Sequence, residues 1–353
     1  MASAGDTPSL AAKVAFLRSA QSYPDTTDVQ TRETHMSWVF LTDRYAYKLK
    51  KPVANPVLDY RRLEAREHFC REELRLNRRL APRVYLDVVP LLAAGDVLRL
   101  GLPGARPLGP FEQIADWLVE MRRLPSERML DAAIGDRTAQ RSELVAIGSR
   151  LGSFFAGAAP VLLGTSDYLA RLEGNVAEQH AALARHGLAG ARLDRIASDL
   201  DGVLHRHRDD FAVRCAEARI VEGHGDLRPE HVYLGGDTKL GPAVIDCLEF
   251  SYDLRVADSA DELAFLRLEC SRLGSYATGQ IILDAYTERT GDRPPDHLLA
   301  FYAGARALVR AKLALWHDHD QPQHAARWLR RAETYLDLAE AAIAGRLPYV
   351  DGS

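Results

Sequence analysis

Residues 223–234 read GHGDLRPEHVYL, and they place two histidines, an aspartate, a glutamate and an arginine in one short segment. The segment lies between two β-prone runs, ARIVE at residues 218–222 and VYL at residues 232–234. Polar side chains beside strand formers cost free energy unless they face water or a ligand. The segment therefore has three interpretations: a solvated turn, a metal site or a catalytic loop.

The composition is that of a chain with enough apolar residues for a large core and no nucleic-acid signature. The chain has 353 residues, of which 47% are hydrophobic, with a mean hydropathy of −0.21, a net charge of −4 and a pI near 6.3. Its basic residues are mostly matched by acids, so we expect no nucleic-acid partner.

Neither the cysteines nor the apolar segments indicate secretion or a membrane. Four well-separated cysteines form no CxxC pair, which argues against a disulfide framework or a zinc ribbon. The N-terminal residues lack the pattern of a signal peptide, and no apolar run is long enough to cross a bilayer. We expect a cytoplasmic protein.

Strand and helix patterns predict an α+β fold with two lobes. Four β-prone runs precede residue 118, at residues 37–41, 45–49, 85–92 and 96–100, and a helical run covers residues 59–80. Residues 111–121 have a mixed pattern. Later segments are helical, at residues 140–151, 166–186, 193–211, 297–317 and 323–344, interrupted by β-rich residues 219–250. We predict a small β-rich N-lobe over residues 1–118 and a larger, mainly helical C-lobe over residues 119–353.

Two aspartates in the central segment suit different chemical tasks. Asp226 follows a glycine and precedes Leu227, which can anchor the loop in the core, so its carboxylate can accept a proton from a substrate hydroxyl. Asp246 follows the apolar run AVI and suits a hard cation such as Mg²⁺. His231 is either a second metal ligand or a hydrogen-bond partner. The agreement of spacing and strand context favours a functional loop over a solvated turn.

These motifs resemble those of a known family. HGDLRPEHV followed by VIDCLEF resembles the HGDxxxxN and IDF pair of the aminoglycoside-phosphotransferase-like family, the small-molecule relatives of protein kinases. Four other segments, YAYKLKKPV, EELRLNRRLAP, WLVEMRRLP and VADSADELAFL, resemble in order its lysine strand, glutamate helix, lobe connector and DxxxDLA brace. The combination points to an uncharacterised bacterial branch, and the antibiotic-resistance enzymes match less well. The order of motifs also suits a kinase independently of the name.

The resemblance implies a phosphotransferase that moves the γ-phosphoryl group of ATP or GTP to a hydroxyl of a small molecule. It implies that Lys48 binds the phosphates, that Asp246 binds Mg²⁺, with or without His231, and that Asp226 deprotonates the acceptor. Lys48 needs a carboxylate to hold it. Glu73 is preferred over its neighbour Glu72 because Glu73 follows the spacing of the apolar residues of its helix.

The same resemblance implies other site residues. The turn ETHMS at residues 33–37 would cover the phosphates with backbone amides and the hydroxyls of Thr34 or Ser37. The connector from Val119 to Met121 would offer backbone groups to the purine. His231 stands where the family has asparagine, a neutral oxygen ligand, whereas imidazole prefers zinc or manganese.

Two further sets of side chains have structural or open roles. Asp258 and Asp261 are expected to brace the catalytic loop by accepting hydrogen bonds from its backbone or from His224, although either carboxylate also suits the start of a helix. Arg306, Arg310 and Lys312 either edge the acceptor pocket or form a solvated basic helix face, and the solvated face is the preferred interpretation.

Two rival functions share part of this evidence. A nucleotide-binding pseudokinase that acts through a protein partner would explain His231. A metal-dependent hydrolase would use His224, Asp226, His231 and Asp246 as a metal cluster, but it leaves Lys48 and the buried glutamate unexplained. The sequence does not identify the acceptor, and it is compatible with a monomer or a homodimer.

Overall fold

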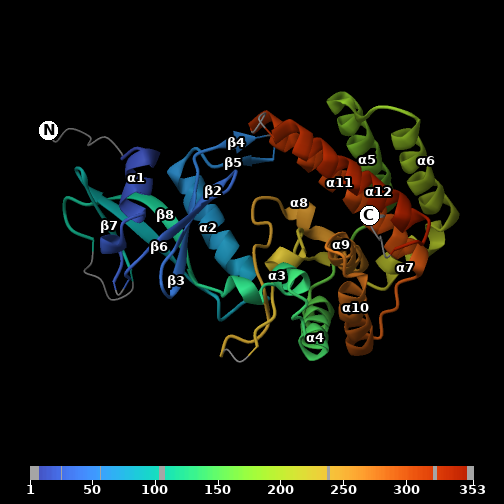
Figure 1. The fold of residues 1–353 in the computed structure, drawn as a ribbon, viewed down its shortest axis with the longest axis horizontal. Helices are drawn as coiled ribbons and strands as arrows, with labels where there is room; N and C mark the ends of the chain where they lie inside the picture. Colours follow the sequence, from blue (N-terminus) through green and yellow to red (C-terminus); the bar gives the residue numbers. More distant parts are fainter. Residues whose placement is uncertain are drawn as a thin grey trace. The chain divides into compact units, whose positions relative to one another are not determined.

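The structure is a computed structural model, and it describes residues 8–24, 26–55, 57–102, 108–236, 239–320 and 324–347. The chain forms two compact units (Figure 1). The first contains the described residues up to Ser126 together with residues 239–252, and the second contains residues 127–236 and the described residues from Asp253 on. The predicted lobe boundary at residues 118 and 119 falls inside a strand, β8 (Gln113–Arg122).

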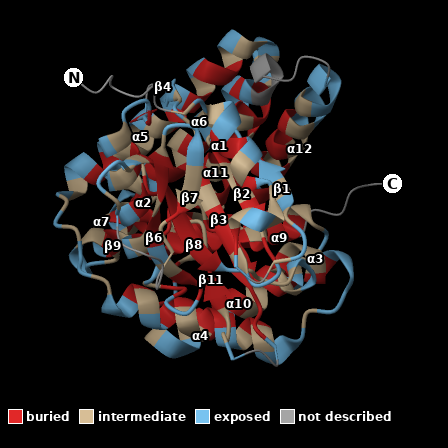
Figure 2. Ribbon diagram, turned by 90° about the vertical axis from the view of Figure 1, so that its left-hand side faces the viewer, coloured by how far each residue is buried: buried red, intermediate tan, exposed pale blue. Residues whose placement is uncertain are grey.

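The first unit is built on a six-stranded antiparallel sheet in the order β1-β2-β3-β8-β6-β7. Its other strands in that sheet are β1 (Gln30–Glu33), β2 (Ser37–Leu41), β3 (Tyr45–Lys50), β6 (Tyr85–Ala94) and β7 (Val97–Leu100). Its remaining elements are α1 (Leu10–Leu17), β4 (Ala54–Asn55), β5 (Leu58–Asp59), α2 (Leu63–Asn77) and β11 (Ala243–Val244). α2 packs against β8 and β6, and buried residues concentrate along β3 and β8 (Figure 2).

The second unit is mainly helical. Its helices are α3 (Leu130–Gly135), α4 (Arg141–Gly157), α5 (Thr165–Leu183), α6 (Ala191–Arg206), α7 (Arg208–Ala216), α8 (Tyr252–Arg255), α9 (Ser259–Arg272), α10 (Tyr276–Thr290), α11 (Asp296–Asp320) and α12 (Ala325–Ile343). Its short strands are β9 (Ile220–Glu222), β10 (Val232–Tyr233) and β12 (Val256–Asp258), and β9 pairs with β12. α11 packs along α12 and α9, and α4 packs against α10.

The structure confirms the predicted fold class and corrects two segments. Residues 111–121, which look mixed in sequence, contain the central strand β8, whose buried Asp116 breaks the apolar pattern. Lys13 contacts this carboxylate at 2.8 Å and Arg66 contacts it at 2.7 Å, so its charge is compensated inside the unit. The predicted helix at residues 193–211 is two helices that meet at His207. Within the described residues, no helix has the length and apolarity needed to cross a membrane.

Candidate active site

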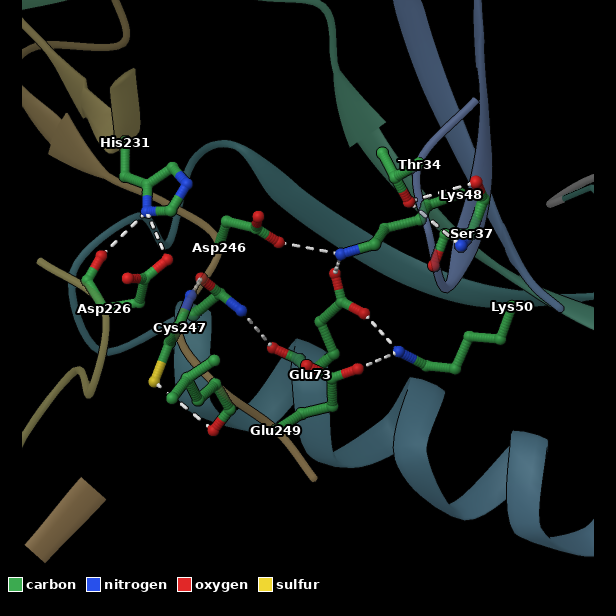
Figure 3. Close-up of polar contacts among 12 residues, drawn as sticks. Thr34, Ser37, Lys48, Lys50, Glu73, Asp226, His231, Asp246, Cys247 and Glu249 are labelled. Atoms are coloured by element: carbon green, nitrogen blue, oxygen red, sulfur yellow. Dashed lines mark hydrogen bonds and ion pairs between the residues drawn. The ribbon is translucent and has the colours of Figure 1, made fainter. Parts of the chain in front are cut away.

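In the first unit, Lys48 lies between two carboxylates. Its Nζ donates to Glu73 Oε1 at 2.9 Å and to Asp246 Oδ1 at 2.7 Å (Figure 3). Burial alone would lower the pKa of Lys48, but Asp246 and Glu73 outweigh it and raise that pKa well above its usual value. Glu73 is fully buried, whereas Glu72 points to the partly exposed Arg75, at 2.8 Å. Three side chains therefore lie together: Lys48, which the sequence assigns to the phosphates, Glu73, which it assigns to holding that lysine, and Asp246, which it assigns to the metal.

A second lysine, which the sequence reasoning missed, completes this network. Lys50 is fully buried and donates to Glu73 Oε2 at 2.6 Å and to Glu249 (Figure 3). The hydroxyl of Tyr60 also donates to Glu249, at 2.7 Å. Burial would raise the pKa of Glu249, but Lys50 and Lys48 outweigh it and lower that pKa. The signal in the sequence was the alternation in YAYKLK, which puts Lys50 on the same face of the strand as Lys48.

Asp246 is held in an unusual backbone conformation. Its φ of 61° lies in the left-handed region, which aspartate and asparagine tolerate better than most residues. Its amide donates to the Tyr85 hydroxyl at 3.1 Å, and the next amide, of Cys247, donates to Asn77 Oδ1 at 3.0 Å. These contacts fix the turn, while 47% of the Asp246 side chain is exposed. The carboxylate therefore presents oxygen to the solvent from a rigid support.

The turn at residues 33–37 satisfies its own polar groups. Thr34 Oγ1 accepts from the Ser37 amide at 3.0 Å and donates to the Ser37 carbonyl at 3.1 Å (Figure 3). Lys51 Nζ donates to the Thr34 carbonyl at 2.7 Å. Ser37 is only 3% exposed, and its contact with phosphates stays a prediction.

The two residues predicted to meet the purine lie inside the sheet. Val119 is opposite Lys48 in β3, and Met121 is opposite Ala46, while β6 pairs with the other side of β8. Strands paired on both sides use their backbone groups in the ladder. The proposed backbone contacts of Val119 and Met121 with a purine therefore stay a prediction, and the chain leaves the sheet only after Arg122.

In the second unit, a glutamate that the sequence analysis did not assign holds the HGD loop. Glu262 Oε1 accepts from the amides of His224 at 2.7 Å and of Gly225 at 2.6 Å. Gly225 has a φ of 86°, and a Cβ on Gly223 would lie 2.4 Å from the same carboxylate oxygen. Both glycines are therefore required by the backbone and by its close approach to Glu262.

The loop is also held from its carbonyl side, but not as the sequence suggested. Arg306 donates to the Gly225 carbonyl at 3.2 Å and binds Asp261 at 2.8 and 2.7 Å, so Asp261 acts on the loop through an arginine. Asp258 accepts from the Ala260 amide at the start of α9 and binds Arg214. The helix-start interpretation is thus the correct one for Asp258.

Asp226 lies in a positively charged environment. Arg228 Nε donates to Asp226 Oδ2 at 2.9 Å, and the same guanidinium contacts Glu230. Burial would raise the pKa of Asp226, but the neighbouring basic side chains, Arg228 first among them, outweigh it and lower that pKa. The carboxylate is therefore ionised at neutral pH and is oriented by Arg228.

His231 is placed as a hydrogen-bond partner of the same loop. Its Nδ1 lies 2.8 Å from the Asp226 carbonyl oxygen (Figure 3), and its Nε2 lies 3.2 Å from Arg228 Nη2. A carbonyl only accepts and a guanidinium only donates, so Nδ1 carries the proton and Nε2 accepts. Of the two roles left open for His231, this geometry supports hydrogen bonding over metal binding.

The basic residues of α11 are paired rather than solvated, which corrects the sequence-based interpretation. Besides Arg306 with Asp261, Arg310 lies 3.6 Å from the buried Glu269, and Lys312 lies 3.3 Å from Glu178. Lys312 itself is buried.

The members of the hydrolase alternative that lie in the second unit, His224, Asp226 and His231, do not form a metal-binding group among themselves. In the described part of the chain, the His, Cys, Asp and Glu side chains that come close enough to share an ion are His207, Asp210 and His297. His224 and His231 are 6.0 Å apart between ring centroids and are not in that group.

The chain has relatives of similar sequence in mycobacteria. The chain is 32% identical over 289 residues to uncharacterized proteins of Mycobacterium tuberculosis and Mycobacterium bovis. The match covers 81% of this chain, and the chain spans about half of the length of those relatives, 54%. No protein-family model matches the chain.

Among solved structures, the chain resembles small-molecule kinases. A choline/ethanolamine kinase family protein from Mesorhizobium loti matches with a TM-score of 0.54 and 14% identity, over 95% of this chain and 99% of that one. Choline kinase from Cryptosporidium parvum matches with a TM-score of 0.52 and 11% identity, over 95% and 98%. Aminoglycoside phosphotransferases also match, with lower scores. The chain therefore has the kinase-like fold of these two kinase structures, with a β-rich first unit and a mainly helical second unit, as the sequence resemblance predicted.

The buried Glu262 predicts a pH-dependent stability. Burial raises the pKa of Glu262 to about 7, and within the described residues its Oε2 has no hydrogen-bond partner. Between the ordinary value of 4.5 and about 7, the folded state keeps a proton that the unfolded state releases. The contribution of this group to stability is therefore present at pH 4.5 and is lost as the pH rises through 7.

We expect the free energy of unfolding of wild type, relative to Glu262→Gln, to fall by about 2 to 3 kcal/mol from pH 4.5 to pH 8. Urea unfolding at several pH values measures this difference, and the exposed Glu288→Gln controls for the removal of one carboxyl. A difference between wild type and Glu262→Gln that is constant across the interval would contradict the assignment.

Proposed function

We propose that the protein is a small-molecule kinase that transfers the γ-phosphoryl group of ATP or GTP, with Mg²⁺, to a hydroxyl of its acceptor. The observation that carries the proposal is the position of Lys48 between Glu73 and Asp246, at 2.9 and 2.7 Å. A lysine fixed by a buried glutamate, beside an exposed aspartate, is the arrangement that positions phosphates and metal in kinases. The neighbours with this fold are described as kinases of choline or ethanolamine, which supports a small-molecule acceptor.

The residues of the first unit fit a magnesium nucleotide. Mg²⁺ is bound in such sites by one or two carboxylates together with phosphate oxygens and water. Asp246 provides a half-exposed carboxylate, and its pairing with Lys48 brings the phosphate-binding cation next to the metal ligand. The bound ion would neutralise charge on the phosphates, while Lys48 would contact a phosphate oxygen and Glu73 would keep its ammonium group in place.

Asp226 is proposed to orient the acceptor hydroxyl and to take its proton. The lowered pKa of Asp226 keeps its carboxylate ionised, and Arg228 fixes its direction. Glu262 and Arg306 hold the backbone that carries it. His231 Nδ1 donates to the Asp226 carbonyl, so the residue that replaces the family asparagine supports the loop in this proposal.

Nucleotide binding gives the first test. At one hundred times the dissociation constant, a ligand adds about 2.7 kcal/mol to stability. We expect ATP or GTP with Mg²⁺ to raise the Tm of the wild type, and we expect this increase to be lost without Mg²⁺ and in Asp246→Asn. Asparagine is chosen because it tolerates the left-handed backbone at this position.

The exposed Asp96 in the turn between β6 and β7 provides the control, and Asp96→Asn should respond to nucleotides like wild type. No Tm increase with either nucleotide would overturn the kinase proposal. An equal increase in Asp246→Asn would remove Asp246 from the metal site.

Turnover tests the role of Asp226. With γ-labelled nucleotide and a panel of hydroxyl compounds that includes choline, ethanolamine and aminoglycosides, we expect phosphoryl transfer to one class. Loss of a general base typically costs 10²- to 10⁴-fold, so Asp226→Asn should lower kcat by about that factor and keep the nucleotide-dependent Tm increase.

The exposed Asp199→Asn on α6 is the matched control and should turn over like wild type. Unchanged kcat in Asp226→Asn would contradict the assigned base. Nucleotide binding without transfer to any acceptor would instead support the pseudokinase alternative.

A further inference from the structure

Three side chains outside the proposed active site form a cluster on the second unit. His297 Nε2 lies 2.7 Å from Asp210 Oδ2, and His207 Nδ1 lies 3.5 Å from the same oxygen. The three candidate ligand atoms all lie within 4.8 Å of one another. The two imidazole rings are stacked, with centroids 3.7 Å apart and planes inclined by 20°. Two rings therefore share one carboxylate.

Rigid elements hold these side chains in place. His207 separates α6 from α7, and its amide donates to the Val203 carbonyl at 3.0 Å while its carbonyl accepts from the Asp210 amide at 3.0 Å. His297 is in the first turn of α11. Beneath the cluster, Phe211 of α7 packs edge-on against Phe301 of α11, with centroids 5.2 Å apart. The donors thus stand on helices that are already packed together.

The donor set and its spacing suit a borderline divalent metal. Two imidazole nitrogens and one carboxylate oxygen form a ligand set typical of zinc, with bonds of about 2.0 to 2.2 Å in tetrahedral geometry. Such bonds place ligand atoms about 3.3 Å apart, close to the 2.7 and 3.5 Å found here.

About a third of each imidazole and 42% of Asp210 are exposed, which leaves a fourth position for water and room for the rings to tilt apart. Tilting is required because stacked rings do not direct both lone pairs to one point. The imidazole nitrogens make a hard ion such as Mg²⁺ a poor occupant.

We propose that His207, Asp210 and His297 bind a zinc ion that ties the junction of α6 and α7 to the start of α11. On binding, the imidazole nitrogens and the carboxylate oxygen coordinate the ion, and His297 binds as the neutral tautomer whose proton is on Nδ1, so that Nε2 offers its lone pair to the ion in place of its hydrogen bond to Asp210. The site needs no part of the phosphotransferase proposal. Its effect is on the stability and geometry of the second unit.

The chain contains a matched control. His180 of α5 and Asp194 of α6 form a similar pair, with Nε2 and Oδ1 2.7 Å apart and the imidazole equally exposed at 32%. In the described part of the chain, no third histidine, cysteine or carboxylate completes that pair as a ligand group. His180→Gln therefore removes a comparable imidazole and hydrogen bond without touching the proposed site.

The test uses the full chain after treatment with a chelator. Calorimetry with Zn²⁺, the Tm in Zn²⁺ or Mg²⁺, and the visible spectrum with Co²⁺ are measured for wild type, His207→Gln, His297→Gln, Asp210→Asn and His180→Gln. We expect one Zn²⁺ per chain, a Tm increase with Zn²⁺ that Mg²⁺ at the same concentration does not give, and a tetrahedral Co²⁺ spectrum in wild type and His180→Gln.

Each of the three site variants should lose at least tenfold in Zn²⁺ affinity. Unchanged far-UV circular dichroism in the metal-free variants would attribute the loss to the missing ligand. The absence of saturable Zn²⁺ binding in wild type would overturn the proposal, and so would equal binding in the site variants, which would place the ion elsewhere. These outcomes do not depend on nucleotide binding or turnover.

Discussion

The buried carboxylate of Glu73 is the group on which the first unit depends. It accepts from two lysines of one strand face, Lys48 at 2.9 Å and Lys50 at 2.6 Å. A buried charge without partners is very unfavourable, and removing one partner of a buried pair leaves the other uncompensated. Glu73 therefore fixes β3 against α2 and places the ammonium group of Lys48 in the same step. The structural role and the proposed functional role of this carboxylate are inseparable.

The charges of this network leave one carboxylate in excess. Two ammonium groups, of Lys48 and Lys50, face three carboxylates, of Glu73, Glu249 and Asp246. The excess lies where water reaches it, on the exposed Asp246, because Glu73 and Glu249 are buried. An exposed negative charge next to a fixed lysine attracts a divalent cation carrying phosphates. The second unit shows the opposite arrangement, in which Asp226 is an ionised carboxylate held among arginines.

Residues that follow a local period could be predicted from the sequence. In these cases the neighbours in sequence show which way a side chain or a turn faces. Examples are the position of Glu73 on the apolar stripe of α2, the alternation of β3 and the glycines of the HGD loop. The fold class, the helices of the second unit and the Lys48 contact with Glu73 came from such signals. The break at His207 was not predicted, because no glycine or proline marks the junction between α6 and α7.

Residues whose partners are distant in sequence were missed. Lys50 was not assigned from the sequence, because its partner Glu249 lies 199 residues away. The polar Asp116 hid the strand β8, since Lys13 and Arg66 that compensate it are far along the chain. Glu262 was not assigned from the sequence, because the amides it accepts from lie in a loop 37 and 38 residues earlier. A hydrophobic pattern with a period of two or 3.6 residues does not show that a charge is compensated by a residue far along the chain.

The most direct measurement is a double-mutant cycle on the affinity for the magnesium nucleotide, with wild type, Lys48→Met, Glu73→Gln and the double variant. In all four proteins Lys50 keeps its contact with Glu249, so this buried lysine retains a carboxylate partner. If Glu73 acts on the nucleotide by holding Lys48, its substitution weakens binding in wild type and has little further effect in Lys48→Met, while Glu72→Gln binds like wild type. Losses that simply add would contradict this account, because they would show that Glu73 and Lys48 act on the nucleotide independently.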